Sequence, residues 1–582
     1  MLKRLLSELK QYKKSTILTM LFAGLEVITD ISVPLIMAWI IDYGIVPKNI
    51  SRVYQFGAIM FIAVIFGLVT GAGAGKFAAN AASGFSYNLR KSMFKKIQMF
   101  SFSNIDTFST GGLVTRMTTD VTNVQNSFQM IIRMAVRAPM TFLSALIMVI
   151  IIEPRMSGIF IIAIAILVVA LFFIIRHALP IFREVFKSYD SLNESVQENI
   201  RGIRVVKGFA RENFESSKFK KTVEKLYKRF VQAEGTVVLN SPFVMMTVYF
   251  CVIMVSWLGA HFVVGGSLST GELTTLFTYI VNILMSLMMM SMIFVLITIS
   301  LESMRRIVEV LEENPDIVNP ENPVMEVANG DISMDHVNFA YKKNAKKYVL
   351  SDINLDIKEG ETIGILGGTG SSKTSLINLI SRLYETTTGS VKVGGIDVRK
   401  YDLKTLRDNV AVVLQKNELF SGSILENLRW GNENATEEEC INACKMACAD
   451  DFIQTFTDKY NTHIEQGGTN VSGGQKQRLC IARALLKKPK ILILDDSTNA
   501  VDTNTDEKIR NSFYNDIPNT TVIIIAQRIL SIKDADRIIV LDDGKINAIG
   551  THDQLKETND IYRMVYEHQQ KDGADFDAKE SF

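Results

Sequence analysis

The chain has 582 residues, 48% of them hydrophobic and 21% charged, and its 63 Lys and Arg against 61 Asp and Glu leave a formal net charge of +2. This length predicts several domains, the apolar content exceeds that of an ordinary soluble enzyme, and the balanced charge argues against a nucleic acid as partner. The cysteines lack paired CxxC spacing, so they are interpreted as reduced thiols rather than a disulfide framework or a zinc site. They are Cys251, Cys440, Cys444, Cys448 and Cys480.

Six apolar runs before residue 302 predict six membrane-spanning helices, because about 20 apolar residues cross a bilayer as a helix. The third run is short and reaches this length only if its helix extends backwards past Arg133 and Arg137, which would then face a cavity or a partner helix rather than lipid. No cleavable signal peptide is expected, because the first run is too long and lacks a small-residue cleavage site. The six runs are Ser15 to Ile45, Tyr54 to Gly75, Ala138 to Ile152, Met156 to Ile175, Asn240 to Gly271 and Leu273 to Leu301.

Basic residues before the first run predict that the amino terminus lies in the cytoplasm, and an even number of spans returns the chain to that side. Two long polar stretches between spans, residues 76–130 and 176–239, predict helices that continue far into the cytoplasm. Such extensions exceed what a simple membrane anchor requires. The basic residues are Lys3, Arg4, Lys10, Lys13 and Lys14.

The composition changes after residue 306 and predicts three regions. Residues 1–310 are expected to form an all-α transmembrane domain of six helices, residues 311–328 a proline-containing linker, and residues 329–582 a soluble α/β domain. Short β-branched runs that alternate with helical patterns favour a largely parallel sheet in the soluble domain. The predicted strands are Thr362 to Leu366, Ile491 to Leu494, Thr521 to Ile525 and Ile538 to Leu541.

The first of these strands runs into a glycine-rich turn and then a helix, which is the context of a phosphate-binding loop. Lys373 would reach the β and γ phosphates and Thr374 would ligate magnesium. Ser372 stands where the strict pattern has glycine, and a positive φ at that position would cost serine about 1–2 kcal/mol. The predicted phosphate-binding residues are Gly367, Gly368, Thr369, Gly370, Ser371, Ser372, Lys373, Thr374 and Ser375.

Two further motifs lie in the same domain. The strand Ile491 to Leu494 ends in Asp495 and Asp496, and the first of these carboxylates is predicted to hold magnesium across from the phosphate-binding turn. Between the two strands lies a serine- and glycine-rich segment followed by a helix, whose N-terminus could grip a γ-phosphate. The residues of this segment are Ser472, Gly473, Gly474 and Gln475.

These motifs resemble those of ABC transporters. The segment Ser472 to Gln475 resembles the ABC signature, and Tyr341 resembles the aromatic residue that stacks on adenine. Gln415 matches the Q-loop glutamine, which the resemblance counts among the nucleotide and magnesium ligands. Asn499 to Asp502 resembles the D-loop, so Asp502 is predicted to belong to the nucleotide site, and residues 550–552 resemble the family's segment near the domain end.

Six spans followed by one P-loop nucleotide-binding domain resemble the half-transporter of type I ABC exporters, also called type IV. The resemblance implies ATP and Mg²⁺ as ligands and a multi-pass protein of the cell membrane, of the bacterial inner membrane type, with a cytoplasmic nucleotide-binding domain. It also implies that two chains pair head to tail in the lipid, each ATP lying between one chain's Walker motifs and the other's signature. Coupling helices are expected near Asn104 to Ser109 and Arg204 to Phe209.

The departures from the family pattern cluster on one half of the composite site. Asp496 stands where the family usually has the glutamate that polarises the attacking water, and Gln527 stands at the switch-histidine position. With Ser372, these changes predict the degenerate-site subunit of a heterodimeric exporter, whose intact signature completes a competent site on its partner. The alternatives are a homodimer with slow ATPase activity, an ATP-gated channel or regulatory module, and a soluble ATPase with a membrane anchor.

The substrate prediction is an amphipathic, drug-like or lipid-like molecule. Met285 and Met289 belong to a methionine cluster in the sixth span, where flexible thioethers either accommodate varied apolar ligands or simply pack. Glu26 and Asp30 share one face of the first span and predict either a substrate pathway for a cationic amphipath or an ion pair with an arginine such as Arg137.

Overall fold

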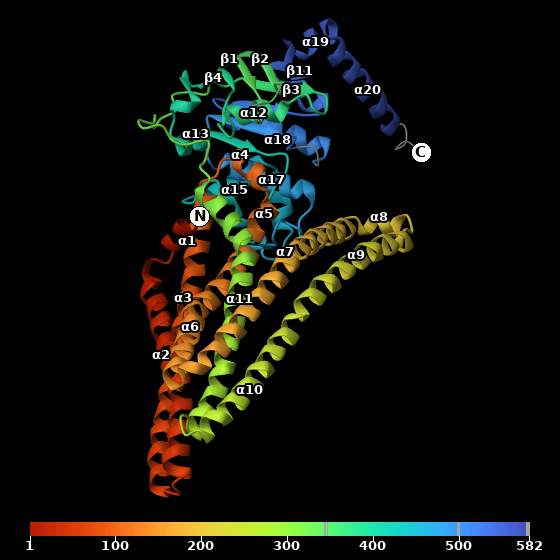
Figure 1. Ribbon diagram of the computed structural model, residues 1–582. Coiled ribbons are helices and arrows are strands. Elements are labelled where there is room, and N and C mark those ends of the chain that lie inside the picture. Colours follow the sequence, from red (N-terminus) through yellow and green to blue (C-terminus); the bar gives the residue numbers. More distant parts are fainter. Residues whose placement is uncertain (343–344, 346, 498–500, 578–582) are drawn as a thin grey trace. The chain divides into compact units, whose positions relative to one another are not determined.

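The computed structural model describes residues 1–342, 345, 347–497 and 501–577, and these form two compact units (Figure 1). The first unit combines Met1–Gln98 with Thr110–Glu313. The second combines Met99–Ser109 with the chain from Asn314 onward. A short segment from the first fifth of the chain therefore belongs structurally to the soluble unit.

The first unit is helical, and six of its segments in the described residues are long and apolar enough to cross a membrane, which confirms the six predicted spans. These segments are Lys10–Ile45, Ile50–Ile97, Thr110–Ile152, Pro154–Ala178, Glu212–Val264 and Thr270–Glu312. The helices are α1 (Leu2–Ser7), α2 (Lys13–Ile40), α3 (Ile50–Ile97), α5 (Thr110–Thr115), α6 (Val121–Ile152), α7 (Ser157–Arg201), α8 (Ile203–Gly208), α9 (Glu212–Val238), α10 (Asn240–Val264) and α11 (Thr270–Glu312).

Several of these helices are much longer than a bilayer is thick. Helix α3 has 48 residues and α7 has 45, so at 1.5 Å per residue each is about 70 Å long, against a hydrocarbon core of roughly 30 Å. Helices α7 and α9 lie side by side as a long hairpin with the short helix α8 at its far end (Figure 1). Helices α6 and α7 meet at the predicted tight turn, where the Glu153 side chain accepts the N–H of Arg155 at 3.2 Å.

The second unit contains a six-stranded sheet in the order β12-β11-β3-β10-β9-β6, with β12 antiparallel to its neighbour and the other pairs parallel. The four predicted strands correspond to β3, β9, β10 and β11. Ile525 at the end of β10 pairs with Ile365 and Asp495, so the chain leaves three strands at one edge. The strands are β3 (Thr362–Gly367), β6 (Val410–Val413), β9 (Ile491–Asp495), β10 (Thr521–Ile525), β11 (Arg537–Asp542) and β12 (Lys545–Gly550).

Two further sheets were not anticipated from the apolar runs. A four-stranded antiparallel sheet has the order β2-β1-β4-β5, and β7 pairs with β8. Residues of β1 and β2 alternate between buried and exposed positions, and this half-buried pattern is weaker in sequence than the continuous apolar run of a central strand. The strands are β1 (Ile332–Phe339), β2 (Leu350–Ile357), β4 (Thr388–Val393), β5 (Ile396–Asp397), β7 (Gly422–Ser423) and β8 (His463–Ile464).

Helix α4 lies in the segment Met99–Ser109, which belongs to the soluble unit, and packs against the rest of that unit. The Tyr384 hydroxyl donates to Asp106 at 2.5 Å, and the Tyr384 ring meets Phe102 edge to face at 6.0 Å. Short helices thus occur at both predicted coupling positions, α4 and α8. The helices of this unit are α4 (Phe102–Phe108), α12 (Lys373–Ile380), α13 (Leu403–Asn409), α14 (Ile424–Leu428), α15 (Glu437–Met446), α16 (Asp450–Gln454), α17 (Gly473–Leu485), α18 (Thr503–Asp516), α19 (His552–Thr558) and α20 (Asp560–Asp577).

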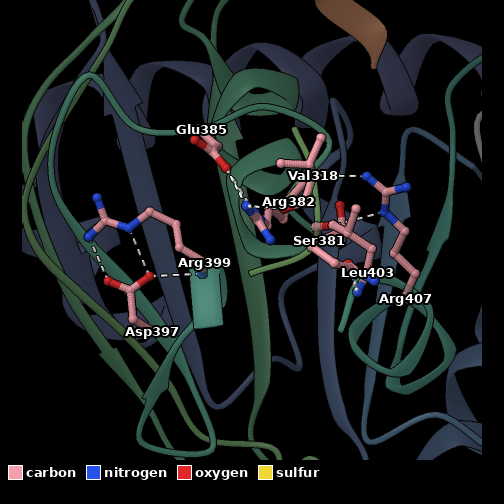
Figure 2. Close-up of polar contacts among 9 residues, drawn as sticks. Val318, Ser381, Arg382, Glu385, Asp397, Arg399, Leu403 and Arg407 are labelled. Atoms are coloured by element: carbon pink, nitrogen blue, oxygen red, sulfur yellow. Dashed lines mark hydrogen bonds and ion pairs between the residues drawn. The ribbon is translucent and has the colours of Figure 1, made fainter. Parts of the chain in front are cut away.

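The buried Arg382 fastens the chain between α11 and β1 to the soluble unit (Figure 2). Arg382, which is 5% exposed, pairs with Glu385 at 2.6 Å and donates to the Val318 carbonyl at 3.1 Å. Arg407 donates to the carbonyls of Ser381 and Arg382, so it holds the turn from which Arg382 projects. This network holds the turn that directly follows α12 (Lys373–Ile380).

Candidate nucleotide site

The nine predicted phosphate-binding residues run from Gly367 at the end of β3, through the glycine-rich loop, to the first turn of α12. Lys373 is the first residue of α12, and its Nζ donates to the carbonyls of Gly367 at 2.7 Å and Gly368 at 3.0 Å. The same ammonium reaches Ser371 Oγ at 3.4 Å. The lysine therefore curls back over the loop, where it can exchange carbonyl partners for phosphate oxygens.

Ser372 adopts the left-handed conformation that the glycine pattern predicts, with φ 74° and ψ 23°. The Ser372 carbonyl accepts the N–H of Leu376 at 3.1 Å, so the folded loop itself holds this conformation, and we expect its cost of about 1–2 kcal/mol to fall on folding.

Ser372→Gly is therefore expected to raise the free energy of unfolding by about 0.5–1 kcal/mol, because relief of the left-handed strain exceeds the entropy that glycine adds to the unfolded chain. ATP affinity should change by less than about twofold. Thermal unfolding and nucleotide titration measure the two effects. Tighter ATP binding without a change in stability would contradict this assignment of the strain.

The magnesium-binding residues proposed from the sequence meet directly. Thr374 Oγ1 donates to Asp495 Oδ2 at 2.9 Å, and Asp495 is 1% exposed. Burial raises the pKa of the Asp495 carboxyl, and the neighbouring negative charge of Asp496 raises it further. Burial lowers the pKa of Lys373, against the opposing effect of both carboxylates. The Thr374 hydroxyl and the Asp495 carboxylate are oxygen ligands of the kind that Mg²⁺ prefers. A bound Mg²⁺ would also offset the repulsion between the Asp495 and Asp496 carboxylates.

Two other predicted residues, Gln527 and Gln415, converge on Asp496. Its Oδ2 accepts from Gln527 Nε2 at 3.1 Å and from Gln415 Nε2 at 3.4 Å. Its Oδ1 is buried and has no hydrogen-bond partner among the described residues. Asp496 itself has φ 48°, and its N–H donates to the Ile525 carbonyl at 3.1 Å. The carboxylate is thus held close to β9 and β10 by two amides, neither of which carries a charge.

Tyr341 lies beside the glycine-rich loop. Its hydroxyl shares a 2.7 Å hydrogen bond with Ser375, and its ring meets Tyr384 edge to face at 5.1 Å. The Tyr341 side chain remains 47% exposed, so one face of the ring is accessible to a stacking partner.

The signature-like segment begins a separate helix, α17. Ser472 is its N-cap, and its Oγ accepts the N–H of Gln475 at 3.3 Å while Gln475 Oε1 accepts the N–H of Ser472 at 2.9 Å. Ser472 and Gly473 are exposed. In the described part of the chain, the side-chain hydrogen bonds of Ser472 and Gln475 join these two residues to each other and not to the glycine-rich loop. The exposed helix N-terminus is available to a ligand that approaches from outside the chain.

Asp502 caps α18, where its Oδ2 accepts the N–H of Thr505 at 2.9 Å, and this backbone hydrogen bond lowers the pKa of the carboxyl. Asn499, the other D-loop residue named from the sequence, lies outside the described residues.

Comparison with known proteins identifies the family. The model of the ABC transporter transmembrane region matches residues 16–292, and the ABC transporter model matches residues 350–499. The chain is 34% identical over 568 residues to the uncharacterized ABC transporter ATP-binding protein YfiB of Bacillus subtilis (strain 168), covering 98% of both chains. The chain belongs to the ABC transporter family.

Other relatives agree with this assignment. The transporter is 33% identical over 552 residues to the uncharacterized ABC transporter ATP-binding protein Rv1273c of Mycobacterium tuberculosis, covering 94% of each. It shares its fold with a bacterial Atm1-family ABC exporter whose structure has ATP bound, with a TM-score of 0.80 at 20% identity over 96% of this chain and 98% of that one. The transporter is thus a multi-pass membrane protein with a cytoplasmic nucleotide-binding domain and an ATPase fold.

In the transmembrane domain, the transporter pairs Glu26 and Asp30 of α2 with arginines of α6. Glu26 lies 3.0 Å from Arg137 and 3.3 Å from Arg133, and Asp30 lies 3.0 Å from Arg137. The carboxylates are therefore neutralised within the chain, as the ion-pair alternative expects. Met285 on α11 is half exposed, and Met289 is partly buried.

Removal of Arg137 should destabilise the transmembrane domain. Asp30 is 33% exposed and has Arg137 as its ion-pair partner, so Arg137→Gln leaves a poorly solvated charge. The expected cost is about 2 kcal/mol, less than the 3–5 kcal/mol of a fully buried pair. Melting temperatures in detergent for Arg137→Gln, Asp30→Asn and the double variant test this. Additive losses would contradict the pairing of Asp30 with Arg137, whereas a loss in the double variant smaller than the sum of the single losses supports it, and the Glu26–Arg137 contact accounts for the loss that remains beyond Asp30→Asn.

The contact of Gln569 with the backbone near Gln527 could not be predicted from any motif or apolar run of the sequence. Gln569 on α20 hydrogen-bonds the backbone just after β10, on both sides of Arg528. It lies 42 residues beyond Gln527 in an exposed polar stretch, and only the folded chain brings the two together.

Proposed function

We propose that this chain is one subunit of a heterodimeric ABC exporter that couples ATP binding and hydrolysis to the export of amphipathic or drug-like molecules. Its own Walker motifs form the nucleotide-binding half of a degenerate ATP site, which binds ATP and Mg²⁺ but hydrolyses ATP poorly. Its signature completes the competent site on the partner chain.

The observation that carries this proposal is the environment of Asp496. A general base must come within hydrogen-bonding reach of the attacking water, directly or through one water. The aspartate is one methylene shorter than the usual glutamate, and the amides of Gln527 and Gln415 hold its Oδ2 against the strand ends. Gln527 also cannot supply the positive charge of a protonated histidine beside the γ-phosphate. Both deficits fall on the same half-site.

The exposed signature supports the assignment of the other half-site. Ser472 and Gly473 stand at the N-terminus of a 13-residue helix, in the family's sequence pattern and with the capping contacts of Ser472 and Gln475 formed. A helix N-terminus stabilises negative charge, so this segment is suited to grip the γ-phosphate of an ATP held by another chain.

The substrate class rests on the transmembrane helices. The intramembrane carboxylates are paired with arginines, so no large uncompensated charge among Glu26, Asp30, Arg133 and Arg137 selects a strongly ionic substrate. The methionines of α11, including Met285 and Met289, offer adaptable apolar contacts. These features favour an amphipathic substrate.

ATP turnover in lipid tests the proposal. The chain purified alone is expected to show negligible turnover, and the chain co-expressed with its partner half-transporter robust turnover. A Lys373→Ala preparation serves as the matched control for this chain's own Walker site. Robust turnover by the chain alone, abolished by Lys373→Ala, would identify a working homodimer and overturn the heterodimer assignment.

A further inference from the structure

The carboxy-terminal helix α20 contacts the loop that carries Gln527. We call residues 526–529, which follow β10, the switch loop. The Gln569 side chain donates from Nε2 to the Gln527 carbonyl at 2.7 Å, and its Oε1 accepts the N–H of Ile529 at 2.8 Å. One amide group therefore bridges the backbone of the switch loop on both sides of Arg528.

Both ends of this bridge are firmly placed. Ile529 is 1% exposed, so its N–H has no access to solvent and would be unsatisfied without Gln569 Oε1. Helix α20 is anchored by Tyr562, which is fully buried and shares a 2.7 Å hydrogen bond with His552 Nδ1. Gln569 lies on the same helix two turns further along.

The bridged loop determines where the Gln527 amide lies. Gln527 Nε2 donates to Asp496 Oδ2, and both carboxylates of the strand end face the Lys373 ammonium. A γ-phosphate bound by Lys373 would lie against this same group of side chains. A change in the backbone position of the switch loop would therefore displace a group that lies where the γ-phosphate of ATP, absent from ADP, would be bound.

We propose that Gln569 is a positioning residue that fastens the switch loop to α20 and so sets the preference of this site for ATP over ADP. The inference rests on the proposed role of this chain's Walker motifs in ATP binding. Gln569 touches no substrate and acts through Gln527.

Hydrogen exchange of the full-length, nucleotide-free chain tests the fastening itself. In Gln569→Leu, the Ile529 amide should exchange at least about tenfold faster than in the unmodified chain, because its partner is gone. Gln570→Leu is the matched control, since Gln570 lies next on the helix and contacts only Tyr566 among the described hydrogen bonds. Unchanged exchange at Ile529 in Gln569→Leu would overturn the proposal. This measurement needs no partner chain and no ATP.

Nucleotide titration tests the consequence. Gln569→Leu should lower the ratio of ATP to ADP affinity by about three- to tenfold, mainly through weaker ATP binding, while Gln570→Leu leaves it unchanged. Gln569→Glu keeps an acceptor for Ile529 but cannot donate to the Gln527 carbonyl, so it should retain slow exchange and still lose part of the ATP preference. An unchanged ratio in Gln569→Leu would overturn the positioning role. If the unmodified chain bound neither nucleotide, the proposed function and the positioning role would both fail, and the exchange result would still decide whether Gln569 fastens the loop.

Discussion

Asp496→Glu combined with Gln527→His should raise ATP turnover at this chain's Walker site by about 100-fold, because a correctly placed general base contributes 10²- to 10⁴-fold. Glutamate adds the methylene that Asp496 lacks. Histidine replaces the Gln527 amide, whose Nε2 now donates to the Asp496 carboxylate at 3.1 Å. The measurement uses the co-expressed pair with the partner's Walker lysine replaced, so that only this site can turn over.

The control for this gain is Lys373→Ala in the same double variant. Lys373 is the cation of the glycine-rich loop, and its removal should return turnover to background. Either single substitution should give less than the pair, since the two residues act on one water and one phosphate. Rapid turnover in this background before any repair of Asp496 and Gln527 would show that the site is not degenerate.

The second large effect is expected at the signature. Ser472→Ala should lower turnover of the co-expressed pair by about 100-fold, because under the proposed function it removes a hydroxyl that would contact the γ-phosphate of the competent site, and such donors are worth about 10²- to 10³-fold. The effect is measured as kcat in lipid. A small change would mean that this signature does not complete the hydrolysing site.

Ser472 is also the N-cap of α17, so folding must be separated from catalysis. Loss of the cap costs about 1 kcal/mol of stability. Ser472→Thr keeps an oxygen for the Gln475 N–H and should retain the unfolding temperature and most of the turnover. Equal losses of turnover in the alanine and threonine variants would indicate a packing effect rather than a lost hydroxyl.

The convergence of the nucleotide motifs could be predicted from the sequence. Strands β3, β9 and β10 are continuous apolar runs that end in chemically distinctive residues, and parallel strands place such ends at one edge of a sheet. The sequence therefore predicts that four side chains lie close together, those of Lys373, Asp495, Asp496 and Gln527. In the structure Gln527 donates to Asp496, and both aspartates lie near Lys373. The six spans were predictable for a similar reason, because length and apolar content alone decide whether a helix can cross a bilayer.

Contacts between distant segments could not be predicted in the same way. The sequence offered an ion pair of Glu26 and Asp30 with Arg137 only as one of two alternatives, because the contact depends on how α6 packs against α2, more than 100 residues away in sequence. Gln569 reaches the switch loop because Tyr562 fixes the direction of α20. The half-buried strands β1 and β2 depend on their partners rather than on a local apolar run.

The central claim is that this chain's Walker site is not the one that turns ATP over, and Lys373→Ala in the co-expressed pair tests it most directly. The account predicts that a substantial fraction of ATP turnover in lipid survives this substitution, whereas replacement of the corresponding lysine in the partner abolishes turnover. Equal loss from both substitutions would contradict the account, because it would mean that the two sites hydrolyse ATP alike.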